Sequence, residues 1–126
     1  MSQPGKILIA DDEPHVLRSL GFVLRKAGYA VLEARDGAEA FRLTEAERPE
    51  LVFLDIMMPG PDGIEVCRRM KSDEDLAGTH VIMLTAKGQE SDRQKSLAAG
   101  ADEYMTKPFS PSRALGRVRA ALGHAQ

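Results

Sequence analysis

Short, mostly apolar runs alternate with longer amphipathic segments along the whole chain. The short runs lie at 6–10, 29–34, 51–54, 81–84 and 102–106, and each predicts a β-strand. The run at 51–54 is apolar at every position, which is typical of a strand that is buried on both faces of a sheet.

The longer segments predict five helices, of which the fourth, at 89–99, is the most polar. Their start and stop signals are Gly28 after the first, Asp36 and Pro49 around the second, Asp62 before the third and Gly100 after the fourth. The residues that we expect to face inward are Val16, Leu20, Val23 and Ala27, then Ala40 and Phe41, then Ile64, Cys67 and Met70, and finally Leu115, Val118 and Leu122.

Five strands that alternate with five helices indicate an α/β fold. The arrangement predicts a doubly wound, five-stranded parallel sheet with helices on both faces and right-handed crossovers. No repeat or linker divides the 126 residues, so we expect a single domain over 1–126.

Composition and charge give no support for a nucleic-acid-binding or membrane protein. A net charge of −2 gives no reason to expect binding to nucleic acid or to a membrane surface, and the apolar runs are far shorter than the roughly 20 residues of a membrane helix. The first six residues lack the apolar stretch of a signal peptide, and the single Cys67, which we expect to be buried, cannot form an internal disulfide. Both features favour a cytoplasmic protein.

Polar residues follow the strands where a parallel sheet collects its ligands, at the carboxyl ends. They are Asp11, Asp12 and Glu13 after the first strand, Asp55 after the third, Thr85 after the fourth and Lys107 after the fifth. We expect Glu13 to be a solvated loop carboxylate and the others to converge at one edge.

Carboxylates packed this closely repel one another unless a cation lies among them. Oxygen ligands without His or Cys suit Mg²⁺ better than Zn²⁺. A carboxylate beside the cation could then attack an electrophilic phosphorus, with the phosphoryl oxygens neutralised by the metal and the lysine.

Four segments carry a resemblance to a known family: IADDE at 9–13, LDIMMPGPDG at 54–63, MLTA at 83–86 and GADEYMTKPF at 100–109. In their order and spacing they resemble the receiver domains of two-component response regulators, over essentially the whole chain. The resemblance implies the flavodoxin-like, CheY-like (βα)5 fold with strand order 2-1-3-4-5. It also implies a signalling switch that catalyses only its own phosphorylation and dephosphorylation, and so not an enzyme in the usual sense.

The resemblance assigns roles to individual residues. Asp55 would be the phosphoacceptor, and it would bind Mg²⁺ together with Asp12, the backbone carbonyl of Met57 and, through water, Asp11. Lys107 would pair with Asp55 at rest and with a phosphoryl oxygen afterwards, and the bond from Lys107 to Pro108 would be cis.

Further roles follow from the same resemblance. Thr85 would donate its hydroxyl to the phosphoryl group, helped by the amide of Ala86. Tyr104 would turn inward as Thr85 moves, although a half-buried tyrosine without a moving part stays an alternative. Met57 and Lys87 stand beside the path of the hydrolytic water, and their chemistry predicts a phosphoryl group that lasts longer than in CheY.

The implied partner is a sensor histidine kinase or a phosphotransfer protein. The C-terminal part, notably KPFSP at 107–111, is most similar to OmpR/PhoB-type regulators, which dimerise through the fourth helix, fifth strand and fifth helix. Glu103 and Arg117 match one charged pair of such dimers. Arg113 would face Arg93 and repel it, so the sequence leaves open whether the dimer forms. We expect His15 to face solvent and His80 to lie in a loop.

Three alternatives come from other functions. A haloacid-dehalogenase-type phosphatase would carry a second Asp two residues after its nucleophile, at the first strand, whereas Asp11 and Asp12 are adjacent. A flavin-binding module would need a Ser/Thr/Gly-rich loop where Glu13 lies. A degenerate receiver that only binds partners would lack the phosphorylation residues. The sequence leaves open the kinase, the stimulus, the output, and whether the receiver stands alone or begins a longer regulator.

Overall fold

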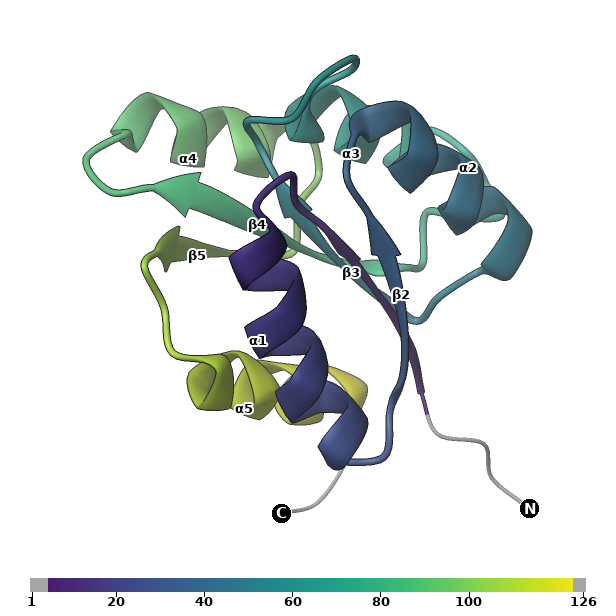
Figure 1. Ribbon diagram of the computed structural model, residues 1–126. Coiled ribbons are helices and arrows are strands. Elements are labelled where there is room, and N and C mark those ends of the chain that lie inside the picture. The colour runs from purple at the N-terminus through teal and green to yellow at the C-terminus, as the bar shows by residue number, and fades with distance from the viewer. Residues whose placement is uncertain (1–4, 124–126) are drawn as a thin grey trace.

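The computed structural model describes residues 5–123 and contains five parallel strands in the order β2-β1-β3-β4-β5 (Figure 1). The strands are β1 (Lys6–Ala10), β2 (Ala30–Ala34), β3 (Leu51–Asp55), β4 (His80–Ala86) and β5 (Glu103–Lys107). The helices are α1 (Pro14–Lys26), α2 (Gly37–Glu47), α3 (Gly63–Lys71), α4 (Glu90–Ala98) and α5 (Pro111–Leu122). The predicted fold and strand order are confirmed.

Helices cover both faces of the sheet. In Figure 1, α1 and α5 lie together on one face, and α2, α3 and α4 lie on the other. Each strand divides its side chains between two buried clusters. In β3, for example, Val52 and Leu54 pack toward α2 and α3, whereas Leu51 and Phe53 pack toward α1 and α5. Burial on both faces explains why β3 is apolar without interruption.

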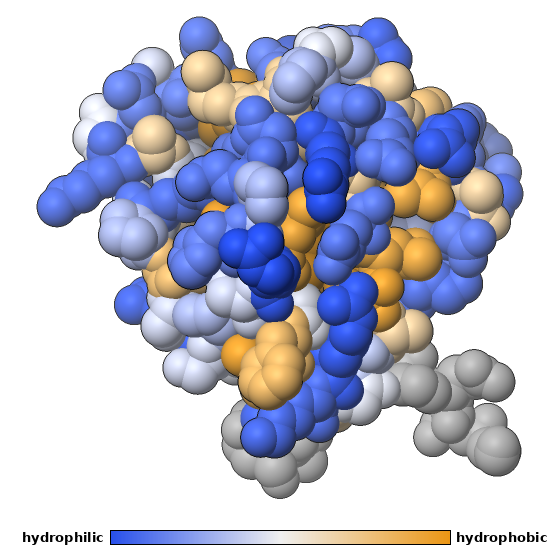
Figure 2. Space-filling view, in the orientation of Figure 1, coloured by the Kyte–Doolittle hydropathy of each residue, from blue (hydrophilic) through white to orange (hydrophobic). Residues whose placement is uncertain are grey.

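The edge strand β2 is less protected. Only Ala34 is buried; Ala30 is exposed and the three residues between them are partly buried. Figure 2 shows hydrophilic residues over most of this side of the molecule, with apolar surface visible along β2.

Capping side chains begin α2 and α3 as predicted. The Asp36 carboxylate accepts a hydrogen bond from the Glu39 amide at 2.8 Å, and the Asp62 carboxylate accepts one from the Glu65 amide at 2.9 Å. Both caps fix helices whose N-termini lie beside the carboxyl ends of the strands. Cys67 is buried in α3, and burial raises the pKa of its thiol to about 11.

The buried face of α1 differs from the prediction. Leu17, Leu20 and Leu24 are fully buried, whereas Val16 and Val23 are only partly buried. Two apolar stripes overlap in this helix, and the leucines occupy the centre of the interface while the valines lie at its border. The predicted stripe was therefore displaced by one residue at two of its positions.

His80 also differs from the prediction. It is the first residue of β4, paired with Leu51, and its Nε2 atom lies 2.6 Å from Oε2 of Glu103. The loop assignment was wrong because the backbone of His80 already pairs with β3, where its amide donates a hydrogen bond of 3.1 Å to the Glu50 carbonyl. His15 is exposed, as expected.

Among residues 5–123, no helix has the length and apolar character needed to cross a membrane. We expect no signal peptide in the first six residues, and residues 1–4 of that segment lie outside the described part of the chain.

Truncation of Leu17 tests the buried face of α1. Leu17 is 2% exposed, so Leu17→Ala should lower the free energy of unfolding by about 2–5 kcal/mol, through lost burial and the cavity left behind. Phe22, on the same helix, is 65% exposed, and Phe22→Ala should change it by no more than about 0.5 kcal/mol. Denaturant unfolding measures both values, and similar losses in the two variants would contradict this packing.

Candidate functional site

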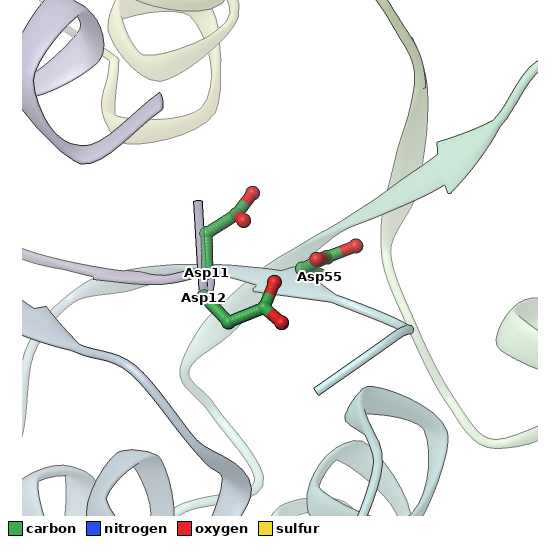
Figure 3. A group of neighbouring side chains, drawn as sticks. All are labelled: Asp11, Asp12 and Asp55. Atoms are coloured by element: carbon green, nitrogen blue, oxygen red, sulfur yellow. The ribbon is translucent and has the colours of Figure 1, made fainter. Parts of the chain in front are cut away.

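Parallel register brings the polar residues at the strand ends together. Ala10 of β1 pairs with Leu54 of β3, so Asp11 and Asp55 follow at the same edge of the sheet. Carboxylate oxygens of Asp11, Asp12 and Asp55 all lie within 4.8 Å of one another. Figure 3 shows the three side chains extending into the space beyond the strands. The predicted acidic cluster therefore exists in the structure.

Asp55 lies in a position that disfavours its negative charge. The residue is 5% exposed, and its Oδ1 atom accepts only a long hydrogen bond, 3.4 Å, from the Met57 amide. Burial, together with the negative charge of Asp11, raises the pKa of Asp55 to about 7, although Lys107 opposes the rise. A cation among these oxygens would relieve the penalty.

Lys107 lies over the cluster at the end of β5. Its Nζ atom is 2.6 Å from Glu13 Oε1, 2.8 Å from Asp11 Oδ2 and 3.4 Å from Asp55 Oδ2. Burial alone would lower the pKa of Lys107, but hydrogen bonds to Asp11 and Glu13 and the charge of Asp55 outweigh it and raise the pKa. The expected contact with Asp55 is thus the longest of three ion pairs. The predicted cis bond before Pro108 is present.

Glu13 is an exposed loop carboxylate, as expected, but it also pairs with Lys107. Its side chain is 57% exposed, but the hydrogen bond from Lys107 and the charge of that lysine lower the pKa of the Glu13 carboxyl. This contact joins residues 94 positions apart, so local sequence could not reveal it. The only sequence signal is that one predicted strand ends in a lysine and another is followed by three consecutive acidic residues.

Thr85 and Tyr104 lie between the acidic cluster and the outer face of α4 and β5. Thr85 is buried, and its hydroxyl donates a hydrogen bond of 3.4 Å to the Met105 carbonyl. Tyr104 is half-buried, and the Arg93 guanidinium lies 4.8 Å from the centre of its ring. Thr85, Arg93 and Tyr104 line one cavity of about 200 Å³. Ala86, the last residue of β4, also lines it and is exposed.

Met57 and Lys87 line two different hollows near the site. The Met57 side chain is 70% exposed and lines a hollow between the loop after β3 and Asp92 and Lys95 of α4. Lys87 is exposed and lines a second hollow together with Lys107. Both positions are therefore open to solvent at the edge of the site.

Glu103 and Arg117, which match a charged pair of OmpR/PhoB-type dimers, contact each other within one chain. Glu103 accepts a hydrogen bond of 2.7 Å from Arg117 Nε through Oε1, while its Oε2 atom contacts His80. Arg93 is held by Glu90 at 2.7 Å and by the Tyr104 ring. The predicted repulsion between Arg113 and Arg93 concerns a second copy and stays a prediction.

Comparison with known proteins gives a consistent result. The model of the response regulator receiver domain family matches residues 7–119. The alkaline phosphatase synthesis transcriptional regulatory protein PhoP of Bacillus subtilis is 45% identical over 117 residues, 93% of this chain and 48% of PhoP. The phosphate regulon transcriptional regulatory protein PhoB of Pseudomonas aeruginosa is 44% identical over 116 residues, 92% of this chain and 51% of PhoB.

Solved structures agree. Chemotaxis response regulator CheY4 of Vibrio cholerae superposes with a TM-score of 0.88 at 28% identity, covering 94% of this chain and 99% of that one. The receiver domain of sensor histidine kinase PA1611 from Pseudomonas aeruginosa, solved with a magnesium ion in its active site cleft, has a TM-score of 0.87 at 29% identity and covers 95% and 98%.

The chain belongs to the response regulator receiver domain family. Its similarity to PhoP and PhoB confirms the resemblance to OmpR/PhoB-type receivers, and the phosphatase and flavin-binding alternatives are removed. Receiver domains are signalling switches of two-component systems. The chain spans about half the length of the curated relatives that it matches.

The raised pKa of Asp55 predicts a pH-dependent gain in stability when its charge is removed. Between the unfolded value of 3.8 and the folded value of about 7, the folded state binds the extra proton, so ionisation of Asp55 destabilises the fold as the pH rises. In chelator, Asp55→Asn should therefore be more stable than the parent at pH 8, on the order of 2 kcal/mol, and equal to it near pH 4.

Denaturant unfolding across this pH range measures the difference. Asp75→Asn, which removes an exposed carboxylate far from the cluster, is the control and should show no such trend. An Asp55→Asn gain that does not depend on pH would contradict the electrostatic explanation.

Proposed function

We propose that this chain is a Mg²⁺-dependent receiver domain in which Asp55 accepts a phosphoryl group from a sensor histidine kinase or a phosphotransfer protein. The observation that carries the proposal is the buried acidic cluster with Lys107 above it. Asp55 is the member of the cluster at the end of the central strand β3. Its carboxylate interacts electrostatically with both Asp11 and Lys107.

The residues present fit a magnesium ion. Every side-chain donor is a carboxylate oxygen, and burial together with the charge of Asp11 raises the pKa of Asp55, a penalty that a cation would relieve. Asp12, Asp55 and the Met57 carbonyl would hold the ion directly, and Asp11 would hold it through water. When bound, Mg²⁺ supplies positive charge that neutralises phosphoryl oxygens. The magnesium ion of the Pseudomonas aeruginosa receiver domain supports this reading.

The side chains around Asp55 divide the work of phosphoryl transfer. A carboxylate oxygen of Asp55 forms the bond to phosphorus as the bond to the donor imidazole nitrogen breaks. Lys107 moves from Asp11 and Glu13 toward a phosphoryl oxygen. The Thr85 hydroxyl and the Ala86 amide donate hydrogen bonds to a second oxygen, so Thr85 gives up its contact with the Met105 carbonyl.

Movement of Thr85 would change the face formed by α4, β5 and α5. Tyr104 lines the same cavity as Thr85, and it would turn into the space that Thr85 leaves. On this face Glu103 is held by Arg117 and His80, so dimerisation through Glu103 requires these internal pairs to open. The proposed output is therefore a change of this face, with a homodimer as one form of it.

Phosphorylation by acetyl phosphate tests the assignment of Asp55. The parent should gain one phosphoryl group per chain with Mg²⁺ and none in excess chelator. Asp55→Asn should gain none, because the amide is not a nucleophile, and Asp12→Ala should lose both metal binding and phosphorylation. Intact-mass spectrometry measures the added group, with Asp75→Asn as a control that should behave as the parent. Equal phosphate uptake by Asp55→Asn and the parent would rule out the assignment.

Met57 and Lys87 should set the lifetime of the phosphoryl group. Hydrolysis needs a water in line with the phosphorus, and an apolar Met57 cannot orient one, while Lys87 can cover a phosphoryl oxygen. The parent should therefore lose phosphate more slowly than CheY. Met57→Asn combined with Lys87→Glu should accelerate the loss about tenfold or more.

Decay of the purified phosphoprotein measures the lifetime. Lys26→Glu, at an exposed position at the C-terminal end of α1, is the matched charge-reversal control and should leave the rate unchanged. If the double variant decays at the parental rate, these two positions do not control hydrolysis.

A further inference from the structure

The loop between β3 and α3, residues 56–62, is held by backbone hydrogen bonds at its base and at its tip. At the base, the Ile56 amide donates to the Leu84 carbonyl at 3.2 Å, and the Ile56 carbonyl accepts from the Gly63 amide at 3.0 Å. At the tip, the Pro59 carbonyl accepts a hydrogen bond of 3.1 Å from the amide of Gly37, the first residue of α2. An element outside the loop therefore fixes its tip.

Gly37 approaches this loop more closely than any residue with a side chain could. A Cβ atom at Gly37 would lie 1.7 Å from the carbonyl oxygen of Pro61 and 2.8 Å from its carbonyl carbon. Both are backbone atoms, so they cannot move aside as the end of a flexible side chain would. The backbone of Gly37 is not left-handed, so space and not conformation requires a glycine here.

The segment that carries Gly37 also touches the acidic cluster. The Ala34 carbonyl, at the end of β2, accepts a hydrogen bond of 3.0 Å from the Asp11 amide. Three residues later, Gly37 contacts the loop that contains Met57. The intervening Arg35 and Asp36 are fixed as well, since the Arg35 amide donates to the Glu39 carboxylate and Asp36 caps α2. Residues 34–37 thus form a short rigid bridge between Asp11 and the loop.

We infer that Gly37 is a positioning residue of the metal site: it sets the distance between the Asp11–Asp12 pair and the carbonyl of Met57. This inference rests on the proposed function, because it matters only if Met57 and the aspartates hold one ion. Gly37 touches neither the metal nor the phosphoryl group and acts through the loop. A methyl group at position 37 would push the loop away from α2 and displace the Met57 carbonyl.

Gly37→Ala tests the inference through metal affinity. The Mg²⁺ dissociation constant of the variant, measured by calorimetric titration of the full chain, should rise about tenfold or more, as for other losses of support around metal ligands. The amide resonances of Met57 and Met58 should shift in the metal-free protein. Gly116→Ala is the matched control, since a Cβ at this helical position meets no atom within 4 Å, and its affinity should equal that of the parent.

A second control tests whether lower stability by itself weakens Mg²⁺ binding. Val118→Ala, a cavity in the buried cluster on the α1–α5 side, should lower the stability and leave Mg²⁺ affinity unchanged. If Gly37→Ala does not fold, Asp36→Ala serves instead, because loss of the cap loosens the first turn of α2 without a collision. It should weaken Mg²⁺ binding in the same direction and by a smaller factor.

The outcomes separate the two proposals. If the parent binds no Mg²⁺ and takes no phosphoryl group from acetyl phosphate, the proposed function fails. If the parent does both and the folded position-37 variant, or Asp36→Ala in its place, binds Mg²⁺ as tightly as the parent, the role of Gly37 is refuted while the proposed function stands.

Discussion

The central constraint in this molecule is the repulsion among three carboxylates held at one edge of a parallel sheet. Register forces the arrangement, because Asp11 and Asp55 follow paired residues of β1 and β3. The sheet cannot relax it, since both faces are packed and Asp55 is almost fully buried. Burial of Asp55, and after it the negative charge of Asp11, raise the pKa of the Asp55 carboxyl. Lys107 offsets part of it, and a divalent cation would offset more.

The fold and the chemistry of the strand ends could be predicted from sequence for one shared reason. Parallel strands place all their carboxyl ends at one edge, so a residue type at a strand end becomes a position in space. Recognising β1 and β3 by their apolar runs was enough to bring Asp11 and Asp55 together. The helix caps Asp36 and Asp62 followed from equally local chemistry.

What sequence could not predict depends on pairing between distant side chains. Lys107 divides its hydrogen bonds among acidic groups, and only the folded chain shows that Glu13 is closer to it than Asp55. His80 lies in a strand and not a loop because its backbone pairs with β3, and its side chain contacts Glu103 of β5. The same carboxylate also binds Arg117 of the same chain. The displaced stripe of α1 is a subtler case, in which two apolar faces compete and packing against the sheet decides.

These internal contacts place the proposed switch between two competing sets of partners. At rest, Lys107 is held by Asp11 and Glu13, and the Thr85 hydroxyl is held by the Met105 carbonyl. A phosphoryl group on Asp55 would bring new oxygens that compete with those partners for both donors. Glu103, Tyr104 and Met105 are consecutive residues of β5. The carbonyl that Thr85 would release is therefore two residues from Glu103, which pairs with Arg117 on the surface. Short covalent distance along β5, and not a long chain of contacts, is then the physical route by which charge at the site would reach the surface.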